Sequence, residues 1–199
     1  MNSKSMNQLK YLLDQHINFN LEEWEAFIEL CDPVLTLPPK SILTNFHQRE
    51  TKIYFIKKGL LRLYYLEEGK EINVSFVTDN QFASSFSSLI THSPSLEALI
   101  TIEESTLISI SYEKLIALYL QFPKFERFGR IFTEQKYLCI ATRNRILQSK
   151  KANDKYDDFV KSHDSKIISN VPQYHIASYL GIEPESLSRI RKKSLNIYQ

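Results

Sequence analysis

Residues 171–193 read VPQYHIASYLGIEPESLSRIRKK, and this stretch decides the fold of the C-terminal region. Pro172 suits the first turn of a helix, and Gly181 can adopt the left-handed conformation of a sharp turn. Pro184 then starts a second helix, with Glu185 favourable to the helix dipole in its first turn. The two helices and the glycine turn between them predict a helix-turn-helix. The apolar face of the first helix consists of Ile176, Ala177 and Leu180.

The second helix has two different faces when its residues are placed about 100° apart. Leu187 and Ile190 share one side, which we expect to be buried. Glu185, Arg189 and Lys192 share the opposite side, where such groups can pair with base edges or phosphates. A plain helical hairpin with solvated charges is the alternative. From these positions, the residues expected to contact DNA are Glu185, Ser188, Arg189, Arg191, Lys192 and Lys193.

The net charge of +2 is divided unevenly along the chain. Residues 1–120 hold 10 Lys and Arg against 15 Asp and Glu, whereas residues 121–199 hold 15 against 8. A mildly acidic body with a basic C-terminal third favours an anionic partner such as DNA. A solvated basic surface without a partner is the alternative that charge alone leaves open.

A long helix is expected from Pro123 to about Leu147. Residues spaced by three and four positions form a heptad seam along it, with polar members at two positions. We expect residues 123–148 to be a dimerisation helix, although a helix buried against its own domain gives the same pattern. The seam consists of Phe125, Phe128, Phe132, Gln135, Cys139, Thr142 and Ile146.

Short runs of β-forming residues fill the middle of the chain, and Gly59 and Gly69 mark turns between them. In one run Ile72, Val74 and Phe76 alternate with polar residues and are expected on one side of a strand. Strands broken about every 8–12 residues, without helices between them, predict an antiparallel roll or sandwich. The expected strands are residues 53–56, 60–66, 71–77, 96–101 and 106–111.

Helices are expected on both sides of this β-rich region. Residues 7–32 favour a helix that ends before Pro33, residues 112–120 a short helix, and residues 150–171 a polar helix followed by a turn. The fold class is therefore α+β. The expected parts are a β-rich domain in residues 1–122, the dimerisation helix in residues 123–148 and a helix-turn-helix domain in residues 149–199.

The composition disfavours several classes of protein. No apolar run approaches the roughly 20 residues of a membrane span, and the N-terminus lacks the apolar core of a secretion signal, so we expect a cytoplasmic protein. Cys31 and Cys139 are too few for a disulfide framework or a Cys-rich metal site. Neither a Gly-rich phosphate loop nor a hydrolase motif is found, which argues against an enzyme. We expect neither a cofactor nor a metal.

Two segments resemble Crp/Fnr-type transcription regulators, in the short form common in Bacteroidetes-like bacteria. Residues 177–193, ASYLGIEPESLSRIRKK, resemble their helix-turn-helix, and residues 54–76, YFIKKGLLRLYYLEEGKEINVSF, resemble their cyclic-nucleotide-binding β-roll, a jelly roll. The resemblance implies a homodimer whose two recognition helices enter successive major grooves of a pseudo-palindromic DNA site. It also implies that Glu185, Ser186 and Arg189 read bases, and that RNA polymerase and a small-molecule effector are partners.

Residues 82–102, FASSFSSLITHSPSLEALITI, depart from the phosphate-binding cassette of the family members that bind cyclic AMP. Ala83 and Ser84 stand near the place of a Gly-Glu pair, and no Arg or Lys occurs between residues 81 and 102. A cyclic phosphate would lack its charge-assisted partner here, so we expect no response to cyclic AMP. A surface turn without a ligand is the alternative to some other polar ligand. The hydroxyls available to such a ligand belong to Ser84, Ser85, Ser87 and Ser88.

Two further features depart from the family. The N-terminal cysteine cluster that holds an iron–sulfur centre in its oxygen sensors is missing, and His47 and His92 are the only histidines in the expected roll. SLNIYQ, residues 194–199, does not accommodate a β-hairpin wing, so we expect the wing to be reduced or absent. The predicted function is a dimeric, sequence-specific DNA-binding transcription regulator. The alternative is a ligand-binding or protein-interaction module with vestigial DNA affinity.

Overall fold

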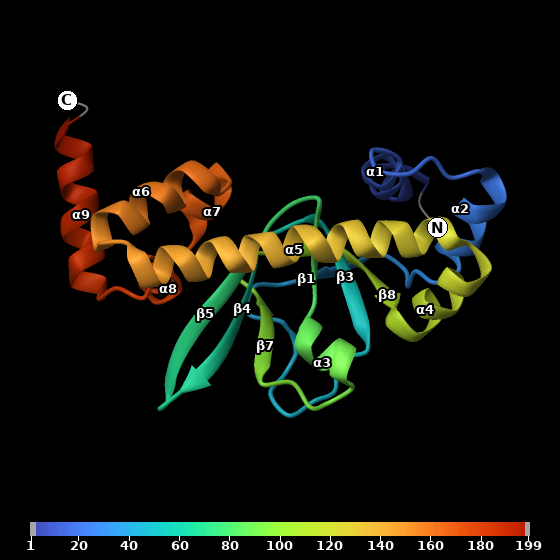
Figure 1. Cartoon of the computed structure of the whole chain (residues 1–199), viewed down its shortest axis with the longest axis horizontal. Coiled ribbons are helices and arrows are strands. Elements are labelled where there is room, and N and C mark those ends of the chain that lie inside the picture. The colour runs from blue at the N-terminus through green and yellow to red at the C-terminus, as the bar shows by residue number, and fades with distance from the viewer. Residues whose placement is uncertain (1–2, 198–199) are drawn as a thin grey trace.

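The computed structural model describes residues 3–197, with side chains from residue 6 to residue 193. Two four-stranded antiparallel sheets form a roll alongside one long helix (Figure 1). The first sheet has the order β1-β8-β3-β6, formed by β1 (Leu35–Leu37), β8 (Ser105–Ser111), β3 (Lys52–Lys58) and β6 (Gln81–Ala83). The second has the order β2-β7-β4-β5, formed by β2 (Ile42–Thr44), β7 (Glu97–Thr101), β4 (Leu61–Glu67) and β5 (Lys70–Val77).

The antiparallel roll predicted from the middle of the chain is confirmed, and a strand is present at each expected position. The sequence pattern does not reveal β1, β2 and β6, because strands of three residues depend on pairing with longer neighbours. A short helix, α3 (Phe86–Thr91), follows β6. The core between the two sheets consists of Tyr54, Ile56, Leu61, Val77, Ala83, Leu99 and Leu107.

Gly59 makes the sharp turn between β3 and β4. Its φ is 147°, and a Cβ at this position would lie 2.3 Å from Ser105 Oγ at the start of β8. Both the backbone conformation and the close approach therefore require glycine.

A bulge in β5 changes the direction of its side chains. Leu63 pairs with Ser75, but the next residue of β4, Tyr64, pairs with Asn73, so that Val74 is an extra residue in β5. The expected alternation of Ile72, Val74 and Phe76 is therefore interrupted, since a bulge shifts the side-chain period by one residue. As a consequence Asn73 is fully buried.

Three helices cover one end of the roll: α1 (Ser3–Asp14), α2 (Leu21–Ile28) and α4 (Tyr112–Gln121) (Figure 1). The segment 7–32, expected to be helical, contains two helices, because the chain leaves the helix after Asp14 and starts again at Leu21. Asn20 and Glu23 form a reciprocal capping box in which each side chain accepts a hydrogen bond of 2.8 Å from the other's backbone N–H. Such a pair fixes the start of a new helix.

The C-terminal helices gather at the other end of α5 (Pro123–Ser149), the long helix of the fold (Figure 1). They are α6 (Ala152–Ser162), α7 (Ser165–Asn170), α8 (Gln173–Leu180) and α9 (Pro184–Ile197). The polar segment 150–171 thus holds two helices, because the Asp164 side chain caps α7 by accepting a hydrogen bond of 2.7 Å from Lys166 N. Their common core also includes Leu60 and Phe76 of the roll, so these helices pack directly on the β-domain.

Candidate nucleic-acid interface

Helices α8 and α9 form the helix-turn-helix predicted from the sequence. Gly181 ends α8 in the left-handed conformation, with a φ of 59°. Gly181 N donates to Ser178 O at 3.2 Å, and Ile182 N donates to Ala177 O at 3.1 Å, which satisfies carbonyls at the end of the helix. Pro184 then begins α9, where its missing N–H costs no hydrogen bond.

The two faces of α9 differ as expected. Leu187 and Ile190 are buried against the C-terminal core, whereas Glu185 and Arg189 are exposed. Arg189 Nη2 donates a hydrogen bond of 3.2 Å to Ser186 Oγ, so these two side chains lie together on the exposed face. The predicted DNA-contacting residues are exposed (Glu185, Arg189, Lys192 and Lys193) or half-buried (Ser186, Ser188 and Arg191).

The cations of α9 are available to an anionic partner. Within residues 6–193, none of its Arg and Lys side chains forms an ion pair with a carboxylate. Helix α9 also lies at the far end of α5 from α1, α2 and α4 (Figure 1). Its guanidinium and ammonium groups can therefore approach phosphates and base edges without breaking an ion pair described in the structure. The backbone of residues 194–197 continues α9, and residues 198 and 199, the end of the segment considered for a wing, lie outside the described residues.

A buried polar cluster, which the sequence analysis did not identify, joins α8 to the roll. It consists of Arg62, Asn73 and His175, all buried, and we call it the interdomain cluster. Arg62 Nη1 donates to Glu71 Oε2 at 2.7 Å and to Asn73 Oδ1 at 3.2 Å. His175 Nδ1 lies 3.4 Å from Arg62 Nη1 and 3.2 Å from Asn73 Nδ2. Since a guanidinium can only donate, Nδ1 accepts and the imidazole is neutral.

The electrostatics of the interdomain cluster favour that neutral imidazole. Burial, assisted by the positive charge of Arg62, lowers the pKa of His175 to about 4, while the carboxylate of Glu71 opposes the shift. The Arg62 side chain, which forms an ion pair with Glu71, is only 9% exposed. Its guanidinium carbon Cζ also lies 4.0 Å from the centroid of the Tyr64 ring. Protonation of His175 would place two positive charges side by side in a buried site.

The open edge of β5 is covered by the same helices. Asn73 N donates to Ser178 Oγ at 3.0 Å, and Ser178 Oγ donates to Glu71 O at 2.7 Å. From α5, Arg143 Nη2 donates to Asn73 O at 3.0 Å and to Tyr179 O at 2.8 Å. Arg143 therefore ties together the long helix, the roll and the first helix of the helix-turn-helix.

Helix α5 turns the predicted seam towards its own chain. Phe125 is 1% exposed and stacks on Phe19 and Phe27, with ring centroids 4.5 and 5.5 Å away. The placement of Phe125 in a dimer interface is therefore wrong: it belongs to the core, as the alternative interpretation of the seam allowed. Phe128 and Phe132 are half-buried and pack against that core. Cavities between α5 and the rest of the chain are lined by the other members of the seam, Gln135, Cys139, Thr142 and Ile146.

Three apolar side chains of α5 that the seam did not include are exposed. Tyr137, Leu138 and Ile140 are 69%, 62% and 60% exposed. Exposed aromatic and aliphatic residues grouped on one helix mark an interaction surface more often than isolated ones do.

The serines of the segment after β6 are engaged inside the roll. Ser85 Oγ and Ser87 Oγ donate to Glu97 Oε2 at 2.7 and 3.3 Å. Ser84 Oγ donates to Lys52 O at 2.9 Å, and Ser88 Oγ donates to the Ser93 carbonyl. Each of the four hydroxyls therefore already donates within the chain, and a polar ligand at this segment would compete with these bonds. A phosphate beside Ser85 and Ser87 would also meet the carboxylate of Glu97.

Cations near the roll come from α5 rather than from the segment after β6. A cavity of about 120 Å³ between the roll and α5 is lined by Ser84 and by Lys136 and Arg143 of α5. The sequence gives no local sign of this arrangement, because the two cations lie more than 50 positions beyond Ser84 and only the packing of α5 brings them there.

The described residues contain neither a group of three metal-ligating side chains nor a helix with the length and hydropathy of a membrane span.

Comparison with known proteins identifies the fold. Residues 34–122 match the family model of the cyclic nucleotide-binding domain. FixK2 from Bradyrhizobium japonicum is 15% identical, with a TM-score of 0.72 over 80% of this chain and 82% of its own. CLP, a c-di-GMP-responsive global regulator from Xanthomonas campestris, is 18% identical, with a TM-score of 0.68 over 89% and 92% of the two chains.

A third similar structure is a transcriptional regulator of the Crp/Fnr family from Eubacterium rectale, with 16% identity and a TM-score of 0.66 over 89% of this chain and 85% of that one. No curated protein shows significant sequence similarity. At these identities the likeness concerns the fold. The resemblance predicted from residues 54–76 and 177–193 is thereby confirmed at that level.

Proposed function

We propose that this chain, which has the fold of Crp/Fnr-type transcription regulators, is a sequence-specific DNA-binding transcription regulator that acts as a homodimer in the cytoplasm. One observation carries the proposal: Arg189 and Glu185 are exposed on α9, opposite the buried Leu187, directly behind the Gly181 turn. This is how a recognition helix presents side chains to a major groove.

The side chains of α9 have separate roles in this proposal. Arg189, with Glu185 and Ser186 beside it, reads base edges, because a guanidinium pairs in bidentate fashion with guanine. Ser188 lies at the edge of the same face. Arg191, Lys192 and Lys193 contact phosphates, which fixes the position of the helix but carries no sequence information. RNA polymerase is the further partner that the family resemblance suggests.

The homodimer is proposed to form through the outward face of α5 rather than through the seam predicted from the sequence. Tyr137 is more than half exposed, and Ala141 lies one turn further along the same face as Tyr137. Pairing with a second copy would remove these apolar surfaces from water. A two-fold dimer presents two α9 helices and so favours a pseudo-palindromic site with half-sites about one helical turn apart.

Cyclic AMP is not the proposed effector. The segment after β6 has no Arg or Lys, and Glu97 already accepts the hydroxyl hydrogen bonds of Ser85 and Ser87. A cyclic phosphate that bound at this segment would lose its hydration, would lie near the carboxylate of Glu97 and would gain no cation from the segment in return.

The test is selection of duplexes from a random DNA pool by the full-length protein, followed by fluorescence anisotropy with the selected duplex and a scrambled one. We expect tighter binding to the selected duplex and a steep loss of affinity as salt is raised, because binding releases counterions. Absence of both effects would leave the ligand-binding or protein-interaction module with vestigial DNA affinity as the better description.

A further inference from the structure

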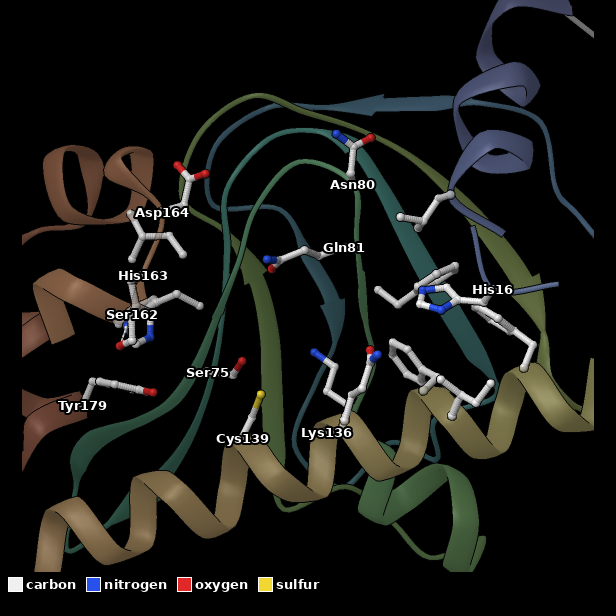
Figure 2. A pocket seen from close by; sticks show the side chains of 18 residues that line it. His16, Ser75, Asn80, Gln81, Lys136, Cys139, Ser162, His163, Asp164 and Tyr179 are labelled. Atoms are coloured by element: carbon white, nitrogen blue, oxygen red, sulfur yellow. Dashed lines mark hydrogen bonds between the residues drawn. The ribbon is translucent and has the colours of Figure 1, made fainter. Parts of the chain in front are cut away.

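A cavity of about 360 Å³ lies between the roll and the C-terminal helices, and no described residue of α9 lines it (Figure 2). Its walls come from α1, the strands β5 and β6, the inward face of α5 and the turn between α6 and α7. Small-molecule sites in proteins are clefts of about 300–1,000 Å³. The cavity therefore has the size of a ligand site and is bounded by both parts of the chain.

The two ends of this interdomain cavity differ in polarity. At one end Phe82, Phe128 and Phe132 form an aromatic wall, with the Phe82 and Phe132 rings 5.3 Å apart in an edge-on arrangement. Beside this wall Lys136 and Cys139 point from α5 into the space, as Figure 2 shows. The neutral polar groups around them belong to Ser75, Gln81, His163 and Tyr179.

Lys136 brings an unbalanced positive charge to the interdomain cavity. Its Nζ lies 5.5 Å from the Phe132 ring centroid, and within the described residues no carboxylate forms an ion pair with it. Burial lowers the pKa of Lys136, and burial also lowers that of His163. Asp164 at the rim accepts a hydrogen bond from Lys166 N as the cap of α7. An ammonium in such surroundings is stabilised by an anion that enters the cavity.

We propose that the interdomain cavity binds a small organic monoanion with a flat apolar body. The apolar body packs on Phe82, Phe128 and Phe132, and the anionic group lies beside Lys136. Such a ligand contacts the roll, α5 and the C-terminal helices at once, and so stabilises their present arrangement. Whether this stabilisation regulates DNA binding rests on the proposed function, whereas binding of the anion to the interdomain cavity does not.

The experiment uses two fluorescent probes with the full-length protein. 8-Anilinonaphthalene-1-sulfonate carries an aromatic body and one negative charge, and N-phenyl-1-naphthylamine has the same body without the charge. We expect saturable binding of both. The variant Lys136→Gln should weaken binding of the sulfonate about tenfold, the loss of one charge-assisted contact, and leave the uncharged probe unchanged. Lys136→Arg should restore sulfonate binding.

Two further variants locate the site. Lys161→Gln removes an equal charge from the exposed surface of α6 and should leave both affinities unchanged. Gln135→Trp fills the interdomain cavity from an exposed position of α5 that does not line the smaller cavity of the roll, and should abolish binding of both probes. Thermal melting of each variant checks that it is folded.

Three results would overturn the proposal: sulfonate binding that survives Gln135→Trp, equal effects of Lys136→Gln and Lys161→Gln, or equal loss of both probes on Lys136→Gln. None of these measurements involves DNA. A failure of the DNA-binding proposal is therefore distinguishable from a failure of this one.

Discussion

Arg62 and His175 are 113 positions apart in the sequence, yet Arg62 Nη1 lies 3.4 Å from His175 Nδ1. The contact joins β4 of the roll to α8, the first helix of the helix-turn-helix. Because both side chains are buried and the imidazole accepts the hydrogen bond, the attachment of the C-terminal helices depends on His175 remaining neutral.

Acid should therefore weaken the fold through His175. The pKa of His175 is about 4 in the folded chain against 6.5 in the unfolded chain, so the unfolded state binds the proton first as the pH falls. The contribution of His175 to the free energy of unfolding is constant above about pH 7. Between pH 6.5 and about pH 4, the free energy of unfolding should decrease by up to about 1.4 kcal/mol for each unit by which the pH falls. Urea unfolding of the wild type and of His175→Gln at pH 7, 6 and 5 measures this contribution.

In His175→Gln the amide oxygen can still accept from Arg62 but does not titrate. We expect the difference in stability between wild type and variant to shrink as the pH falls. His16→Gln, a change at an exposed histidine of the N-terminal region, is the control. Parallel pH profiles for wild type and His175→Gln would contradict the assigned role.

Two substitutions on α9 should separate base reading from phosphate contact. Arg189→Ala should cost about 1–3 kcal/mol on the selected duplex and relax the preference at one base pair. Lys192→Ala should weaken binding to selected and scrambled duplexes alike and reduce the dependence on salt. Fluorescence anisotropy at several salt concentrations measures both. Identical losses for the two variants on both duplexes would be incompatible with these roles.

The dimer should be sensitive to charge on the outward face of α5. Tyr137→Glu places a carboxylate among exposed apolar side chains and should yield folded monomers in sedimentation velocity experiments. Tyr11→Glu, at a tyrosine of α1 that is 70% exposed, is the matched control and should leave the dimer intact. Phe132→Glu should instead lower the melting temperature, because Phe132 packs on Phe82 within the same chain. A dimer that persists in Tyr137→Glu would locate the interface elsewhere.

The turn of the helix-turn-helix has space for a side chain at Gly181, but its backbone conformation there disfavours residues other than glycine. A Cβ on Gly181 would meet Leu147 Cδ2 at an ordinary 3.7 Å, but the φ of 59° is unfavourable for alanine. Gly181→Ala should therefore lower the free energy of unfolding by about 1–2 kcal/mol, and Gly181→Asn by less, because asparagine adopts this conformation more readily. Denaturant unfolding tests the order of the two, and equal stabilities would refute the explanation.

Features fixed by neighbouring residues could be predicted from the sequence. Pro172, Gly181 and Pro184 each constrain the backbone where they stand, so the helix-turn-helix and its two faces follow from a few positions. The long strands could also be predicted, because runs of β-forming residues between turn residues such as Gly59 and Gly69 mark them locally. The break before α2 was also readable, since Asn20 and Glu23 have the spacing of a capping box.

Features fixed by distant contacts could not be predicted in this way. The heptad pattern shows that Phe125, Phe128 and Phe132 share a face, but it does not say whether that face meets the chain's own core or a second copy. Likewise the burial of Asn73 depends on a bulge at Val74, which regular alternation conceals. The sequence around His175 does not indicate that Arg62 of β4 is its partner, because the two side chains meet only when the C-terminal helices pack on the roll.

The cover over β5 also restricts how the protein can move. β5 is the last strand of its sheet, and its outward N–H and C=O groups at Asn73 and Glu71 are occupied by Ser178 and Arg143. If α8 were to swing away, that edge would become a template on which a foreign strand could add, the route by which sheet proteins aggregate. The same three hydrogen bonds thus cover the strand edge and hold the helix-turn-helix on the roll, so a rearrangement that frees these helices must slide over this edge or replace its cover.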